Sequence, residues 1–83
     1  MMKKVFVNGY GSIGSRIIQF IKDDPEIQIV GVGKYSPDSK VTEAIEQGFN
    51  VYVPEKNQNA FSDFSITGNI ESALDESDLV IDA

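Results

Sequence analysis

The sequence predicts an α/β fold built on a parallel sheet. Two observations carry this prediction. Short apolar runs alternate with amphipathic helical patterns, and successive apolar runs are spaced by about 20–25 residues. That spacing is typical of right-handed βαβ crossovers, in which a helix returns the chain to the start of the next strand. We therefore expect about four main strands in a sheet that is only partly doubly wound.

The first half of the chain carries the clearest patterns. Lys3 to Asn8 contains an uninterrupted apolar run, which predicts a strand buried on both faces. Isoleucines at positions 13, 17, 18 and 21 recur at helical spacing and predict an inward helical face. This helix should stop by Asp24, because Pro25 disfavours helical geometry at the residue before it. Ile27 to Gly33 predicts the second strand.

A second helix and a third strand follow. The helix is expected over roughly Lys40 to Gln47, with Asp38 or Ser39 as its N-cap. Gly48 lies just past its end, where a left-handed residue is favoured. Asn50 to Val53 then predicts the third strand.

The pattern after Glu55 is weaker. Asn57 to Phe64 suits a helical turn or a loop, and Ser65 to Thr67 suits a short strand. Asn69 is a candidate N-cap for a helix that runs through Glu76. The inward face of this helix is expected to comprise Ile70, Ala73 and Leu74. Leu79 to Asp82 predicts the last strand, so the helices after the first two strands would cover one sheet face more fully than the other.

Composition excludes several classes of function. The 83 residues make one small domain or part of one, with seven basic and thirteen acidic side chains and a net charge of −6. This balance argues against binding nucleic acid or an anionic membrane, since both need clustered Lys and Arg. The chain has no Cys and no His, so we expect no catalytic residue and no metal site in it. It has no signal-peptide pattern and no apolar stretch near the ~20 residues of a membrane span, and a cytoplasmic protein is expected.

A glycine motif lies between the first strand and the first helix. Gly9-x-Gly11-x-x-Gly14 in this position is typical of the phosphate-binding turn of a Rossmann-like dinucleotide fold. Gly9 allows the tight turn, Gly11 lets a diphosphate approach the backbone, and Gly14 permits close packing of helix on strand. The free amides of Ser12 and Ile13 would bind the anion. The alternative is a strand-to-helix turn with no ligand.

The residue that follows the second strand bears on which dinucleotide binds. NAD-selective sites normally place an acid about 20 residues after the motif. Position 34 is a lysine, and no acid lies within three residues of it. Lys34, assisted by the hydroxyl of Ser36, therefore predicts that NADP is accepted, because an ammonium attracts a 2′-phosphate. A solvated loop lysine is the alternative.

Three further residues near the motif have open roles. Asn8 could lock the turn through side-chain hydrogen bonds or contact the ligand. Tyr10 could pack beside the turn or over the adenosine region. Asp82, at the end of the last strand, could cap a following turn or lie near the ligand.

Several segments together resemble a known family. Asn8 to Gly14 followed by Arg16 is similar to the opening of phosphorylating glyceraldehyde-3-phosphate dehydrogenases, the archaeal type above all. That type has a small hydroxyl residue where Ser12 stands, whereas the bacterial and eukaryotic type usually has arginine. The resemblance extends over three further segments: Gly31 to Lys34 with Pro37-Asp38, Glu46 to Val53, and Ser77 to Ala83.

The resemblance implies a homotetrameric enzyme that oxidises glyceraldehyde 3-phosphate to 1,3-bisphosphoglycerate with phosphate and NADP or NAD. Carried over by position, the three glycines, Ser12 and Ile13 would hold the pyrophosphate, and Lys34 the 2′-phosphate. The family uses a catalytic cysteine, which this chain lacks. Residues 1–83 would then be the amino-terminal portion of the dinucleotide-binding domain, inactive alone and prone to self-association.

Two other hypotheses remain at this point. The chain could be a free-standing nucleotide-binding or sensing module without catalysis. It could also be the cofactor domain of another dehydrogenase with the same entry motif, such as aspartate-semialdehyde or homoserine dehydrogenase.

Overall fold

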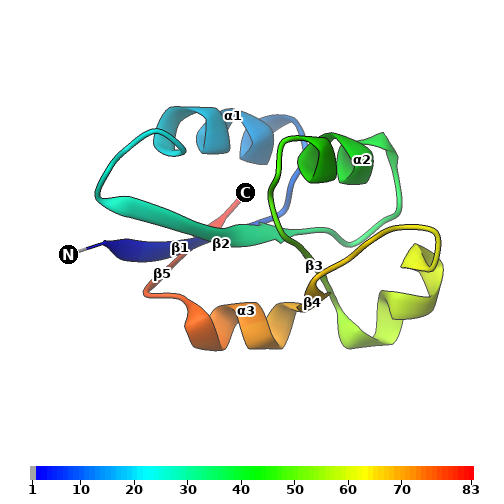
Figure 1. The fold of residues 1–83 in the computed structure, drawn as a ribbon. Coiled ribbons are helices and arrows are strands. Elements are labelled where there is room, and N and C mark those ends of the chain that lie inside the picture. The colour runs from blue at the N-terminus through cyan, green and yellow to red at the C-terminus, as the bar shows by residue number, and fades with distance from the viewer. Residues whose placement is uncertain (1) are drawn as a thin grey trace.

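A computed structural model describes residues 2–83 and contains one all-parallel sheet (Figure 1). The strands lie in the order β4-β3-β2-β1-β5. Their bounds are β1 Lys3–Asn8, β2 Ile27–Gly33, β3 Val51–Val53, β4 Gly68–Asn69 and β5 Leu79–Asp82. The parallel α/β arrangement is confirmed, and the four expected main strands are joined by the two-residue β4 at one edge.

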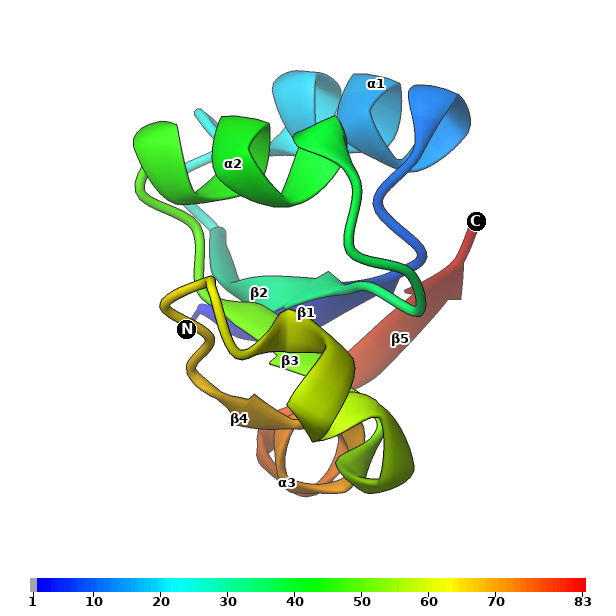
Figure 2. The ribbon, with the colours of Figure 1, turned by 90° about the vertical axis from the view of Figure 1, so that its right-hand side faces the viewer.

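The helices form two layers around this sheet. Helices α1 (Ser12–Ile21) and α2 (Ser39–Glu46) lie side by side on one face, as both ribbon views show (Figures 1 and 2). Helix α3 (Ile70–Glu76) lies on the opposite face. The 3₁₀-helix Glu55–Phe61 lies in the connection from β3 to β4, and its last residue, Phe61, packs in the apolar cluster that contains Ile18 of α1. The expected asymmetry between the two faces is confirmed.

Strand β1 is an interior strand of the sheet. It pairs with β2 on one side and with β5 on the other, and Val5, Phe6 and Val7 are all buried. Successive side chains of a strand point to opposite faces. Accordingly, Val7 packs in one apolar cluster with Ile18 of α1, whereas Phe6 packs in a second cluster with residues of α3. Burial on both faces explains why the sequence of β1 is continuously apolar.

The helix termini follow their local sequences at α2 and α3. The Asp38 carboxylate accepts from the backbone N–H of Lys40 at 3.0 Å, which makes Asp38 the N-cap of α2. Asn69 caps α3 in the same way, through Ser72. Gly48 follows α2 with φ +86°, the left-handed conformation expected there.

Three local predictions are wrong. The short strand near residue 66 is displaced, because Thr67 bonds the carbonyl of Val51 but the ladder residues are Gly68 and Asn69. Leu74 does not face inward; it is 41% exposed on the outer side of α3. Ile13 is 66% exposed, because its side chain lines a cleft at the start of α1 and does not pack in the apolar core.

Within residues 2–83, no helix combines the length and apolar character that crossing a membrane requires.

Candidate cofactor-binding site

A cleft of about 400 Å³ opens where β1 and β2 end and α1 begins. Crevices at the carboxyl ends of parallel strands are the usual ligand sites of open α/β sheets. All seven residues expected from the sequence to bind the cofactor line this cleft: Gly9, Gly11, Ser12, Ile13, Gly14, Lys34 and Ser36. Four others complete the lining, namely Tyr10, Gly33, Tyr35 and Ala83, whereas Asn8 and Asp82 lie outside it. The fold thus brings the glycine turn and the end of β2 into one cavity.

Two glycines of the motif are required by the protein itself. Gly9 has φ +105°, a conformation that side chains disfavour, and a Cβ there would lie 2.6 Å from the Ala83 carbonyl oxygen. A Cβ on Gly14 would overlap the carbonyl oxygen of Gly9. Gly14 therefore lets α1 start directly against the turn, which is the packing role expected from the motif.

Gly11 is different. Its φ is −122°, and a Cβ built on it would meet no other atom within 4 Å. No neighbouring atom in the described part of the chain therefore excludes a side chain at this position. The free space above Gly11 belongs to the cleft, so a side chain there would occupy room that a ligand could use.

The start of α1 supplies the polar component of the cleft. No side chain caps this end of the helix, in contrast to α2 and α3, whose first amides are capped by Asp38 and Asn69. The first turn of α1 also contains no acidic residue. The first amides of a helix have no intrahelical acceptor, and the helix dipole favours an anion beside them. The amides of Ser12 and Ile13 are therefore available to a diphosphate.

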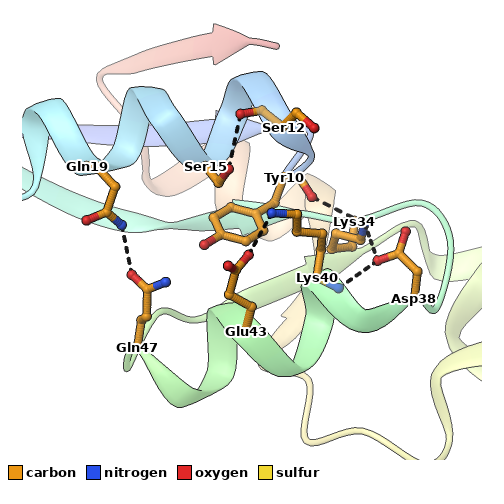
Figure 3. Close-up of polar contacts among 9 residues, drawn as sticks. All are labelled: Tyr10, Ser12, Ser15, Gln19, Lys34, Asp38, Lys40, Glu43 and Gln47. Carbon is orange, nitrogen blue, oxygen red and sulfur yellow. Dashed lines mark hydrogen bonds and ion pairs between the residues drawn. The ribbon is translucent and has the colours of Figure 1, made fainter.

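Tyr10 fixes the position of the glycine turn through its buried side chain. Its side chain is buried between α1 and α2, which agrees with packing beside the turn (Figure 3). Burial, together with the nearby Glu43 carboxylate, raises the pKa of the Tyr10 phenol. The carbonyl oxygen of the same residue points the other way and accepts a hydrogen bond from Lys34 Nζ at 3.2 Å.

Lys34 is not a solvated loop residue. Its side chain is 7% exposed, and its ammonium lies 2.8 Å from Asp38 Oδ1 (Figure 3). The hydrogen bond from Lys34 is the main cause that lowers the pKa of the Asp38 carboxyl. The ammonium lines the cleft, and it is already paired with a carboxylate that the prediction from sequence did not take into account.

The partner acid was missed from the sequence. Asp38 lies four residues after Lys34, one residue outside the stretch around position 34 that contains no acid. The available signal was the N-cap: because Asp38 starts α2, the loop must turn back, and this places its carboxylate beside the end of β2. Ser36 also contributes to this loop, with Oγ 3.5 Å from Asp38 Oδ2.

Asn8 connects three segments at the edge of the cleft. Its Nδ2 donates to Asp82 Oδ1 at 3.0 Å, and its Oδ1 accepts from the Tyr35 hydroxyl at 2.9 Å. Both hydrogen-bonding groups of the side chain are therefore used within the protein. This arrangement agrees with the locking role and places Asp82 beside the turn.

Comparisons with known proteins identify relatives for nearly the whole chain, although no family model matches it. The glyceraldehyde-3-phosphate dehydrogenase of Sulfolobus acidocaldarius is 37% identical over 82 residues, which cover 96% of the chain. Those of Methanobacterium formicicum and Metallosphaera sedula are each 38% identical, over 98% and 99% of the chain. The chain spans only 24–25% of the length of these relatives. By sequence, it corresponds to the amino-terminal quarter of the archaeal glyceraldehyde-3-phosphate dehydrogenases, and in that part it belongs to their family.

Proposed function

We propose that the cleft binds the adenosine and diphosphate portion of NADP or NAD, and that residues 1–83 form the amino-terminal portion of the dinucleotide-binding domain of a glyceraldehyde-3-phosphate dehydrogenase. The support comes from two independent sources. The cleft joins a glycine turn, an uncapped helix terminus and a lysine at the ends of adjacent parallel strands. The relatives that match nearly the whole chain carry that enzyme's name.

The residues of the cleft fit such a cofactor. The diphosphate would accept hydrogen bonds from the amides of Ser12 and Ile13, above the open surface of Gly11. Lys34, with the Ser36 hydroxyl nearby, would interact with the 2′ position of the adenosine ribose. Gly9 and Gly14 act indirectly, by allowing the backbone path that points these amides into the cleft.

For the whole protein we propose the oxidation of glyceraldehyde 3-phosphate to 1,3-bisphosphoglycerate with inorganic phosphate, in a cytoplasmic homotetramer. The nicotinamide, when bound, serves as the hydride acceptor. The 83 residues themselves only bind and orient the adenosine side of the cofactor. Because they contain no cysteine, we expect no turnover from this chain alone.

The observation that carries the proposal is the open space at Gly11. Gly11→Ala should leave the fold intact, since the new methyl group contacts no protein atom, but should weaken NADP binding about tenfold or more by occupying the cleft. Amide chemical-shift titration of the 83-residue chain with NADP and NAD measures both effects.

Gly68→Ala is the matched control. It adds the same methyl group on β4, outside the cleft, where the neighbouring atoms are at ordinary contact distances of 3.5 Å and more. We expect it to bind NADP like the unmodified chain. Equal affinities of the Gly11→Ala and unmodified chains, or no binding of either nucleotide to the unmodified chain, would refute the proposed function.

A further inference from the structure

We propose that Asp38 determines coenzyme discrimination at this cleft, by competing with the 2′-phosphate of NADP for the ammonium of Lys34. The inference rests on the proposed function, and it concerns a residue that the sequence motif does not include. It predicts that the chain distinguishes NADP from NAD only weakly, although a lysine lines the cleft.

The first argument is the geometry of the pair. Lys34 Nζ lies 2.8 Å from Asp38 Oδ1 and donates to the carbonyl oxygen of Tyr10 at 3.2 Å (Figure 3). An ammonium has three N–H donors. Two of them are thus directed to the protein, and one is left for a ligand oxygen.

The second argument is charge. The Lys34 side chain is 7% exposed, so little water screens its attraction to the carboxylate. The pair as a whole carries no net charge. A phosphate that approaches Lys34 also approaches Asp38, and the repulsion from the carboxylate offsets much of the attraction from the ammonium. NAD, which has a hydroxyl in place of this phosphate, experiences neither effect strongly.

The third argument is that Asp38 is held where it stands. Its Oδ1 also accepts from the backbone N–H of Lys40 at 3.0 Å, and the Ser36 hydroxyl lies 3.5 Å from Oδ2. Because this carboxylate is the N-cap of α2, moving it away from Lys34 would uncap the helix. An incoming phosphate therefore cannot displace Asp38 without a cost in stability.

The test is Asp38→Asn, with NADP and NAD titrated separately into the 83-residue chain. Asparagine keeps the capping oxygen and removes the charge, so α2 should remain intact. Since the Asp38 side chain is 49% exposed, the repulsion is partly screened, and we expect NADP affinity to rise by about three- to tenfold relative to NAD. Asp38→Ser, which also keeps a capping oxygen, should give the same direction and serves if the asparagine variant folds poorly.

Asp24→Asn is the matched control. Asp24 Oδ1 accepts from the backbone N–H two residues ahead, as Asp38 does, but Asp24 lies before β2 and outside the cleft. This variant removes one negative charge from the same acidic chain, and the NADP-to-NAD affinity ratio should not change. An equal rise in this control would show a general charge effect and overturn the inference.

The remaining outcomes separate the two proposals. If Asp38→Asn binds both nucleotides with an unchanged or lower NADP-to-NAD ratio, the inference is wrong while the proposed function stands. If the unmodified chain and its variants bind neither nucleotide, the proposed function fails and the inference fails with it.

Discussion

Asn8 and Asp82 are register partners at the carboxyl ends of the neighbouring strands β1 and β5, and the Asn8 carboxamide donates to the Asp82 carboxylate at 3.0 Å. The same carboxamide accepts from the Tyr35 hydroxyl, which lies in the loop after β2. One side chain thus ties together the ends of three strands at the edge of the cleft, which makes it a stability element of the site.

Asn8→Ala should lower the free energy of unfolding by about 1–2 kcal/mol, because both hydrogen bonds are lost at a partly buried position. Urea denaturation measures this change. Tyr35→Phe removes only one of the two bonds and should cost less than Asn8→Ala. A larger loss in Tyr35→Phe would mean that the Asn8–Asp82 contact contributes nothing.

Gly14→Ala should destabilise the chain by about 3 kcal/mol, because the methyl group overlaps the carbonyl of Gly9 and the two segments must separate. Alanine gains about 1 kcal/mol of helix propensity over glycine, which is too little to compensate. Ser15→Ala, one residue later in α1, loses only an exposed hydrogen bond to Ser12 and should change stability slightly. Thermal and urea unfolding of both variants give the comparison; equal stabilities would contradict the close approach.

The Lys34–Asp38 pair predicts how stability depends on pH. The folded-state pKa of Asp38 is lowered from 3.8. The pair therefore contributes stability that is present above the unfolded pKa and is lost as pH falls through the lowered folded value. The difference in unfolding free energy between the unmodified chain and Asp38→Asn should shrink as acid is added from pH ~5 downward. A difference that stays constant to the acid limit would argue against the ion pair.

We expect the chain to self-associate, and we propose that the contact forms along the edge strand β5. The strand pairs with β1 on one side and ends the sheet on the other, with Leu79 and Val80 49% and 39% exposed. Exposed apolar edge strands are common sites of pairing between chains. Val80→Lys should reduce the concentration-dependent mass seen in analytical ultracentrifugation. Phe20→Lys, at an 88% exposed position on α1, should have little effect; the reverse result would place the contact on the helix.

Much of this fold was predictable because its signals are local. The bounds of β1, β2 and β5 follow from apolar runs stopped by glycine or polar residues, and the caps of α2 and α3 follow from Asp38 and Asn69. The strand that was expected near residue 66, but lies at Gly68 and Asn69, shows the limit of such signals. A two-residue strand such as β4 has almost no pattern of its own, and its position depends on pairing with β3, which is a tertiary property.

The site shows the same division. The glycine motif identifies the turn, and its residues do line one cleft. Spacing from the motif also found Lys34, but it did not reveal that the ammonium is buried and paired. Burial of a charged side chain depends on what the loop after β2 folds against, and the sequence around residue 34 contains no local pattern for this.

The burial of Tyr10 has a consequence for the energetics of recognition. A three-residue loop with two glycines would ordinarily be among the most mobile parts of a chain and would lose that freedom when a ligand binds. Here an aromatic ring inserted between two helices, and a carbonyl bonded to a lysine, immobilise the loop during folding itself. A nucleotide would consequently encounter a surface that is already ordered. Its binding free energy would reflect the contacts that it makes, because little conformational entropy of the loop would be lost on binding.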